Sequence, residues 1–305
     1  MELNITKKEP ILTIIIPAKN DGFMANFNYR LETTLNTIAN SANQLGRLED
    51  LEILISDWGS QVPLKEVLQL DEITKQVTRY LITPPDIAEK EQRDSPFPIV
   101  IVQNAAIRRA RGQYIMQTDS DVIFTRTFMA KLWEVIDGKK KNYVDPQRAL
   151  IGSKRRQIPW DVISQSPARA ALVEALERYG HELPIDTDHN FGFCATGMMV
   201  MHRDMWWELR GYDERLIYWG WMEIDLGLRA VMKHPWFDVS INHDMFIYHM
   251  EHYSPETKRE TTRSKNPMDR PKHYAPNKEN WGLVDLDLKI LDYSTPDLKP
   301  SLLLM

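Results

Sequence analysis

The sequence predicts an α/β fold in which a mostly parallel sheet is flanked by helices. Three observations lead to this class. Segments typical of strands alternate with segments typical of helices along the first 140 residues, which is the pattern of right-handed βαβ units. Apolar residues make up 43% of the chain and charged residues 27%, as in ordinary globular proteins. A chain of 305 residues has room for one large domain or two small ones, with a sizeable core.

The strands of this first part are expected at short apolar or β-branched runs that end in turn residues. Ile11–Ile16 is the clearest run, because Pro17 ends it. Three more strands are expected at Leu51–Ser56, Val77–Thr83 and Gln113–Thr118. Ligands of parallel sheets bind at the carboxyl ends of the strands. The loops after Ile16, Ser56 and Thr118 are therefore expected to form the site.

Helices are expected between these strands, where apolar residues recur at helical spacing. In Tyr29–Ala42 they stand at 31, 35, 38 and 42. Further helices are expected at Val62–Leu70, Ile99–Arg111 and Thr127–Asp137. Gly112 and Gly138 are expected to close the last two, and a loop is expected to begin at Pro84-Pro85.

The second half has a different character, because it holds all eight histidines and seven of the nine tryptophans. Pro167–Tyr179 and Ile224–Lys233 are expected to be helices, and Phe191–Met201 a strand. Residues 254–280 are polar and basic with little periodicity, which is typical of a loop or lid.

Charge and cysteine content exclude several classes. The net charge of −5 is unlike the basic surface of a nucleic-acid binder. A single cysteine, Cys194, excludes a disulfide framework and a zinc site with several thiolates, and we expect it to be buried. Residues 1–10 lack a signal-peptide core, and the longest apolar run, 11–18, is too short to span a bilayer. We expect a cytoplasmic protein without a transmembrane segment; peripheral membrane contact stays open.

The sharpest motif is Asp119-Ser120-Asp121, directly after the strand that ends at Thr118. Two carboxylates one residue apart on a turn can face one hard cation, and Mg²⁺ or Mn²⁺ takes such oxygens together with those of a diphosphate. The plain alternative is a solvated acidic turn. The position at the end of a strand favours the metal interpretation.

A second motif, Tyr218–Leu226, places two tryptophans around a glycine and two acids at the start of a helix. The indoles of Trp219 and Trp221 offer flat apolar faces to sugar rings. A carboxylate beside them is desolvated, and its pKa rises toward that of a useful base. The alternative is that Glu223 and Asp225 only complement the helix dipole.

A third motif is the histidine pair His249 and His252, after an apolar run. An imidazole at the end of a strand could complete a metal shell, although a lone histidine more often has a structural role. Nearby His243 and Asp244 are weaker candidates. The chain has no glycine-rich dinucleotide loop after its first strand and no Walker phosphate loop.

Taken in order, these motifs resemble the GT-A glycosyltransferases, and glycosyltransferase family 2 in particular. The resemblance covers about residues 11–252 and is carried by 12–20, 51–60, 104–112, 114–121, Gly197, 210–216, 219–226 and 248–252. Asn280-Trp-Gly-Leu is also similar to some of these enzymes. The resemblance implies a GT-A fold with a Rossmann-like sheet.

The resemblance also implies a nucleotide-sugar donor, with a UDP-sugar favoured, and Mn²⁺ or Mg²⁺ as cofactor. Positions matching the donor site of the family are Pro17, Ala18, Asn20, Asp57, Asn104, Arg108, Asp119 and Ser120. Trp58 stands where the family usually has a second acid, so Asp57 would contact the base alone. The implied metal ligands are Asp119, Asp121 and His249, with His252 as second choice.

The implied acceptor side comprises Trp219, Trp221, Gly197 and His252. Met222 stands at the family's first acid and Glu223 at its second, so Glu223 inherits the role of base. Asp225 would bind the acceptor or brace the helix, and is the second candidate for catalysis. A base on the acceptor side implies inversion at the anomeric carbon.

The sequence is thus expected to encode a metal-dependent inverting hexosyltransferase that acts on a glycan hydroxyl, by family analogy in surface-polysaccharide synthesis. Residues 1–150 would bind the donor, residues 151–253 would form the acceptor and catalytic half of the same domain, and residues 254–305 a lid or extension. Two alternatives stay open: a nucleotidyltransferase, for which 17–20 is a poor phosphate loop, and a non-catalytic glycan-binding protein.

Overall fold

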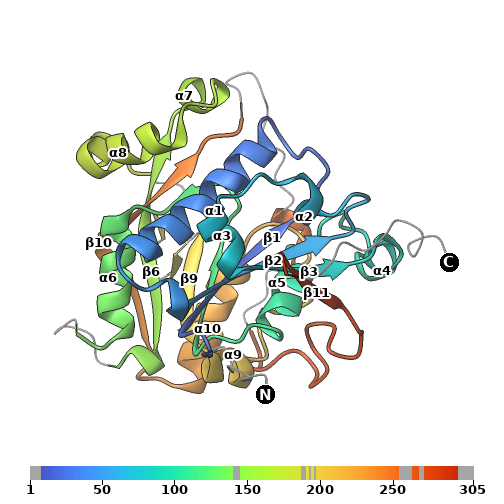
Figure 1. The fold of residues 1–305 in the computed structure, drawn as a ribbon. Coiled ribbons are helices and arrows are strands. Elements are labelled where there is room, and N and C mark those ends of the chain that lie inside the picture. The colour runs from blue at the N-terminus through green and yellow to red at the C-terminus, as the bar shows by residue number, and fades with distance from the viewer. Residues whose placement is uncertain are drawn as a thin grey trace, which may run out of the picture.

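In the computed structural model a single mixed sheet runs through the molecule, with helices on both faces (Figure 1). The structure describes residues 8–139, 145–186, 190–191, 194–195, 197–253, 263–267 and 271–294. Within these residues the nine strands of the sheet have the order β11-β3-β2-β1-β4-β9-β6-β10-β5. The short strands β7 (Asn190–Phe191) and β8 (Cys194–Ala195) form a separate ribbon.

The first-half strands are parallel, as the sequence predicts. β1 (Leu12–Ala18) lies between β2 (Leu51–Trp58) and β4 (Tyr114–Thr118), and β3 (Thr78–Thr83) extends the sheet beyond β2. Apart from Ile82 of β3, their apolar side chains are buried, because both faces of the sheet are covered. The loops that follow β1, β2 and β4 therefore leave from the same edge, as expected.

The second-half strands make the sheet mixed. They are β6 (Ala149–Ile158), β9 (Met198–His202) and β10 (Asp238–Met250). β9 pairs antiparallel with β4 and with β6, whereas β6 and β10 are parallel. Two short strands complete the sheet antiparallel to their neighbours: β5 (Val122–Ile123) on β10, and β11 (Lys289–Asp292) on β3.

The described helices are α1 (Phe27–Gln44), α2 (Leu64–Val67), α3 (Glu72–Val77), α4 (Pro85–Glu91), α5 (Ile99–Ile107), α6 (Arg126–Ile136), α7 (Trp160–Ser164), α8 (Arg169–Tyr179), α9 (Arg203–Leu209) and α10 (Met222–Lys233). α1, α6 and part of α3 pack on one face of the sheet, and α5, α9 and α10 pack on the other. A smaller cluster joins α7 and α8, which lie together at one end of the molecule, to the end of β10 (Figure 1).

Four sequence predictions need correction. The expected loop at Pro84-Pro85 is helix α4, since proline fits the first turn of a helix. The helix expected over 62–70 is only the short α2. α5 ends at Ile107, and Gly112 does not cap it; a Cβ there would collide with the backbone of Thr13. The single strand expected over 191–201 is divided into β7, β8 and β9.

The expected lid falls partly outside the described residues, which omit 254–262 and 268–270. Its described parts contain a 3₁₀ turn, Arg263–Lys265, and are anchored by two buried asparagines. Asn266 binds the segment at Tyr218, and Asn277 donates to the carbonyls of Arg210 and Tyr212. None of the helices in the described part of the chain is long and apolar enough to cross a membrane.

Candidate active site

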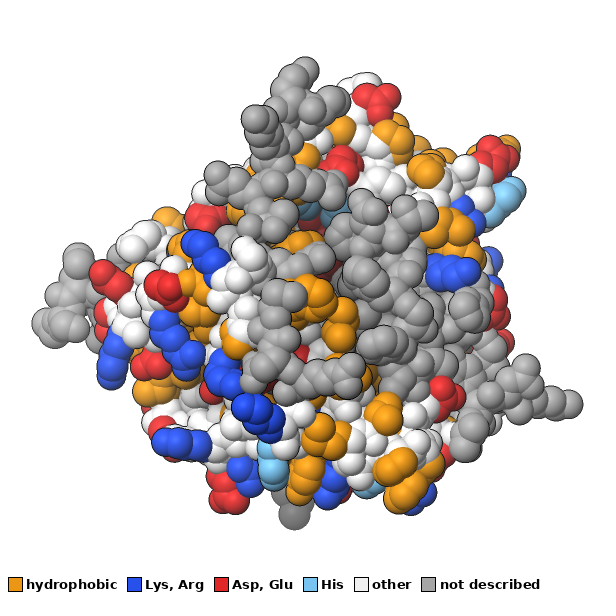
Figure 2. Space-filling view, turned by 180° about the vertical axis from the view of Figure 1, so that it is seen from behind, with side chains coloured by type: hydrophobic (Ala, Val, Ile, Leu, Met, Phe, Trp, Pro, Cys, Tyr) orange, Lys and Arg blue, Asp and Glu red, His pale blue; other side chains and the backbone are white. Residues whose placement is uncertain are grey.

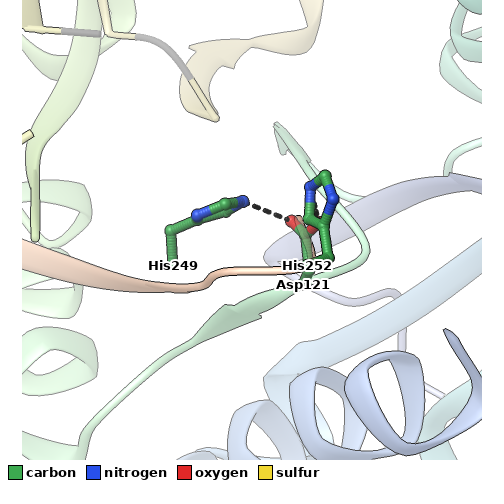
Figure 3. Close-up of side chains that lie close together, drawn as sticks. All are labelled: Asp121, His249 and His252. Carbon is green, nitrogen blue, oxygen red and sulfur yellow. Dashed lines mark ion pairs between the residues drawn. The ribbon is translucent and has the colours of Figure 1, made fainter. Parts of the chain in front are cut away.

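Asp121, His249 and His252 lie together at the edge of the sheet where β4 ends (Figure 3). The pairing of β5 with β10 sets His249 opposite Val122, and the N–H of Met250 donates to the carbonyl of Asp121 at 2.8 Å. Asp121 Oδ1 is 3.5 Å from His249 Nε2, and its Oδ2 is 3.2 Å from His252 Nε2. Residues far apart in sequence thus form one cluster.

A buried arginine, Arg30 of α1, ties this cluster to the loop after β1. Its Nη1 is 3.0 Å from Asp121 Oδ2, while Nη2 donates to the carbonyl of Phe23 and Nε to that of Ala25. The same loop has a left-handed backbone at Met24 and Asn26, with φ of 58° and 57°, which is uncommon for residues other than glycine. Arg30 therefore holds a locally strained loop beside the carboxylate. The sequence argument missed this residue, because one arginine in an amphipathic helix is usually solvent-exposed.

Burial shapes the protonation of the cluster. Burial, together with the charge of Arg155, lowers the pKa of His249 to about 4, so this imidazole is neutral at neutral pH. Burial alone would raise the pKa of Asp121, but the two histidines beside it hold that pKa well below its ordinary value. A neutral imidazole next to an ionised carboxylate is the state in which both can bind a metal.

The chemistry of the cluster fits a divalent cation. Each of the three residues offers one ligand atom, and these atoms all lie within 4.8 Å of one another. Among the described residues, none donates a hydrogen bond to buried Asp121 Oδ1, although a buried carboxylate oxygen normally has a donor. A cation held by Asp121, His249 and His252 would satisfy this oxygen. His252, expected on the acceptor side and as second choice for the metal, thus lies among the candidate ligands.

Asp119 lies beside this group and faces a different partner. Its Oδ2 is 3.7 Å from Nη1 of Arg155 on β6, and its N–H donates to the carbonyl of Gly197 at 3.3 Å. A Cβ at Gly197 would come within 3.0 Å of Asp119 Oδ2, and φ there is +86°, so only glycine fits easily. Arg155 also binds Asp186, with Nε 3.1 Å from Oδ2. The polar run Ser-Lys-Arg-Arg-Gln at 153–157 was the available signal for Arg155.

The acidic motif lies at the start of α10, as predicted, and its two acids differ. Asp225 Oδ2 is 2.6 Å from Nε of Arg229, which is fully buried, so this carboxylate is engaged in an ion pair within its own helix. Glu223 acts on Tyr212: burial, then the charges of Glu223 and Asp119, raise the pKa of that phenol well above its ordinary value. The charges of Glu223 and Asp119 thus act on the same buried phenol.

The turn that contains Trp219 and Trp221, just before α10, is held by hydrogen bonds from a later segment of the chain. Asn266 accepts from the N–H of Tyr218 at 3.0 Å and donates to the carbonyls of Tyr218 and Gly220. Trp221 precedes α10 with φ of 71°, an unusual conformation for so large a residue. Trp219 of this turn is 45% exposed.

Several expected donor residues have partners within the protein. Asp57 is buried, and its carboxylate accepts from Ser60 Oγ and from the N–H of Leu64 at 2.7 Å. Asn20 donates from its N–H to Ser60 Oγ at 2.8 Å and from its side chain to the carbonyl of Val62. Pro17 and Ala18 are buried at the end of β1. These residues shape the loops after β1 and β2, at the same edge as the cluster.

Asn104 and Arg108 stand at the end of α5, where they support other parts of the chain. Asn104 is fully buried, donates to the carbonyl of Tyr212 at 2.9 Å and accepts from the N–H of the same residue at 2.8 Å. The guanidinium of Arg108 lies 5.0 Å from the ring centre of Trp281. Ser120 contributes its carbonyl, which accepts from Thr34 Oγ1 at 3.1 Å.

A sequence profile described as glycosyl transferase family 2 matches residues 13–210, about two thirds of the chain. The chain belongs to glycosyl transferase family 2. Its family is one of glycosyltransferases, and its α/β architecture is consistent with the GT-A fold. The family decides against the nucleotidyltransferase and the non-catalytic binding protein. No curated protein sequence matches the chain significantly.

Three solved structures illustrate more distant likeness. S. aureus TarS is 12% identical, with 79% of this chain and 36% of that chain covered and a TM-score of 0.45. The catalytic domain of Drosophila beta1,4galactosyltransferase 7, with xylobiose, is 10% identical, with 87% and 82% covered and a TM-score of 0.43. PcManGT from Pyrobaculum calidifontis, a mannosyltransferase with GDP-Man and Mn²⁺, is 14% identical, with 82% and 59% covered and a TM-score of 0.46. This chain spans about a third of TarS, and at these scores the likeness supports no conclusion about its chemistry.

Proposed function

We propose that this glycosyltransferase is metal-dependent and transfers a hexose from a UDP-sugar to a hydroxyl group of a glycan. The observation that carries the metal dependence is the cluster of Asp121, His249 and His252, with its buried oxygen that has no donor among the described residues. When bound there, the cation would neutralise the charge that develops on the leaving diphosphate. The choice of UDP comes from the family resemblance of the sequence.

The ligand set favours Mn²⁺ over Mg²⁺. Two imidazole nitrogens and one carboxylate suit transition metals, whereas Mg²⁺ prefers oxygen ligands and keeps much of its water. Of the two cofactors that the sequence leaves open, Mn²⁺ is the better match to His249 and His252.

Glu223 is the proposed general base. It removes the proton of the acceptor hydroxyl while the oxygen attacks the anomeric carbon opposite the departing diphosphate, which inverts the configuration. Asp225 is less suited, because its ion pair with buried Arg229 engages it within the helix. Exposed Trp219 is the proposed platform for the acceptor sugar, and Asp119 would border the donor side, with Gly197 against it on the acceptor side. Residues 1–150 and 151–253 keep their proposed donor and acceptor roles, and 254–305 that of a lid or extension.

The metal is tested by the stabilisation that UDP gives to the protein. We expect UDP with Mn²⁺ to raise the melting temperature of the wild type, with a smaller rise for Mg²⁺ and none with EDTA. Asp121→Asn keeps the shape of the side chain and should abolish the rise. Asp204→Asn, at an exposed aspartate of α9, is the matched control and should keep it. Equal stabilisation by UDP in EDTA and in the Asp121 variant would contradict the metal site. A parallel titration with GDP tests the choice of nucleotide.

A further inference from the structure

A series of hydrogen bonds connects Glu251 through Gln157 to His249, one of the proposed metal ligands. Gln157 Nε2 donates to Glu251 Oε2 at 2.9 Å, and Gln157 Oε1 is 3.1 Å from His249 Nδ1. Gln157 and His249 are direct neighbours on the parallel strands β6 and β10. Gln157 lies outside the motifs of the sequence, and Glu251 lies within 248–252 without a role assigned to it.

The carboxylate of Glu251 sets the donor–acceptor direction of these hydrogen bonds. An ionised carboxylate only accepts hydrogen bonds, so the NH₂ of the Gln157 amide must face Glu251 and the amide oxygen must face His249. An amide oxygen also only accepts. His249 therefore carries its proton on Nδ1, and its Nε2 keeps a free lone pair.

That lone pair points to the cluster, because His249 Nε2 is the atom 3.5 Å from Asp121 Oδ1 (Figure 3). The opposite tautomer would place a proton there and would block a ligand. In known metal sites, groups that fix the tautomer and orientation of a ligand histidine typically change metal affinity 10–100-fold when they are removed.

Glu251 also positions the second histidine. Its Oε1 accepts from the backbone N–H of His252 and of Tyr253, each at 3.0 Å. One carboxylate thus contacts the backbone of one candidate ligand and, through Gln157, the ring of the other.

We propose that Gln157 and Glu251 are positioning residues that fix His249 in the Nδ1-protonated tautomer and so prepare the site for its cation. The proposal rests on the metal role proposed for the cluster. It assigns to Gln157 a function that Leu or Met, of similar size, could not fulfil, because Leu has no acceptor, the Met thioether is only a weak one, and neither donates to Glu251.

The test measures Mn²⁺ affinity without nucleotide, from the free Mn²⁺ signal in electron paramagnetic resonance, and the tautomer of His249 by ¹⁵N NMR of the metal-free protein. Gln157→Met should weaken Mn²⁺ binding about 10–100-fold and allow the Nε2-protonated tautomer. Gln147→Met, at an exposed glutamine before β6, is the matched control and should bind as the wild type does.

A double variant that exchanges the side chains of residues 157 and 251 distinguishes a lost hydrogen-bond pattern from a general disturbance of the fold. Glu251→Gln alone offers one oxygen to three N–H donors, and Gln157→Glu alone sets two carboxylates side by side, so each should weaken Mn²⁺ binding. In the double variant the new amide at 251 can accept from the backbone and donate to the carboxylate at 157, which accepts from His249. We expect the double variant to recover most of the wild-type affinity.

The outcomes separate the two proposals. Wild-type affinity and tautomer in Gln157→Met, or no recovery in a folded double variant, would overturn the positioning role while leaving the metal site intact. A wild type that does not bind Mn²⁺ would overturn the metal role, and the NMR tautomer would still decide whether the hydrogen-bond chain fixes His249.

Discussion

The two acids that follow the Trp-Gly-Trp motif are alike in chemistry but differ in their partners within the protein. Both Glu223 and Asp225 were candidates for catalysis from sequence, where they look alike. The family motif ranks Glu223 first, and the structure adds a physical reason, because the partner of Asp225 is a buried arginine one helical turn away on α10. A sequence shows that the side chains are acidic, whereas their partners depend on packing.

The first prediction therefore compares these two acids. Glu223→Gln cannot accept the acceptor proton, and kcat should fall at least about 100-fold with UDP affinity unchanged. Asp225→Asn leaves the charge of Arg229 without its partner, so it should lower the free energy of unfolding, by about 3–5 kcal/mol. Kinetics at saturating donor and denaturant unfolding measure the two effects. Near-normal turnover in Glu223→Gln would remove this residue as the base.

The second prediction concerns Asp57. Burial raises the pKa of this carboxyl to about 6 from its ordinary value of 3.8. The folded protein thus holds the proton more tightly than the unfolded chain does. The resulting stability is fully present below about pH 4 and is lost as the pH rises through about 6, a change of about 3 kcal/mol.

Asp57→Asn has no such titration and isolates the effect. The free energy of unfolding of the wild type minus that of the variant should fall between pH 4 and pH 7. The measurement is denaturant unfolding of both proteins across this range. A difference that stays level with pH would contradict the raised pKa.

At the scale of elements, prediction from sequence succeeded where one property dominated. β1, β2 and β4 are apolar runs buried on both faces, and α1 and α6 have a clear apolar stripe. β6 was missed because half of it is polar: its Arg155 and Gln157 turn to the site, and tertiary contacts outweigh local preference. The candidate site was only partly predictable, because its local motif is visible in the sequence and its distant contacts are not. The Asp-Ser-Asp motif is local, whereas Arg30, Arg155 and Gln157 matter only through distant partners.

The third prediction belongs to the turn between Tyr218 and Trp221. Asn266 makes three hydrogen bonds to the backbone of this turn from a buried position. Asn266→Ala should loosen the indole of Trp219 and raise the acceptor KM several-fold, with donor affinity kept. Stability should fall by about 1–3 kcal/mol, because buried backbone groups lose their partner. Asn280→Ala, at an exposed asparagine, is the control. An unchanged acceptor KM would show that the hydrogen bonds of Asn266 do not position the turn for the acceptor.

At the scale of the molecule, β9 joins the two halves, since it pairs with β4 from the first half and β6 from the second. The candidate ligands and the proposed base come from both sides of this strand. On the face seen in Figure 2, basic and acidic side chains of the described residues are interspersed, without one large field of either sign. This pattern agrees with the small net charge of the chain.

The fourth prediction concerns the edge of the sheet. β11 covers β3, and the hydroxyls of Tyr293 and Tyr80 lie 2.8 Å apart. Truncation before Lys289 should uncover the edge of β3, lower the melting temperature and cause concentration-dependent association, measured by light scattering. Tyr293→Phe keeps the strand and should cost only about 1 kcal/mol. A truncated protein that stays monomeric and equally stable would show that β11 is dispensable.

The position of β11 also sets the order in which the protein can be completed during its synthesis. β3 ends at Thr83, and its outer partner begins at Lys289. At about 5–20 residues per second, a ribosome needs roughly 10–40 s to make the chain between them. Throughout that time the outer hydrogen-bonding groups of β3 have no strand to pair with. The nascent chain is then most exposed to wrong pairing, and slower initiation or a chaperone that binds extended segments should raise the yield of folded enzyme.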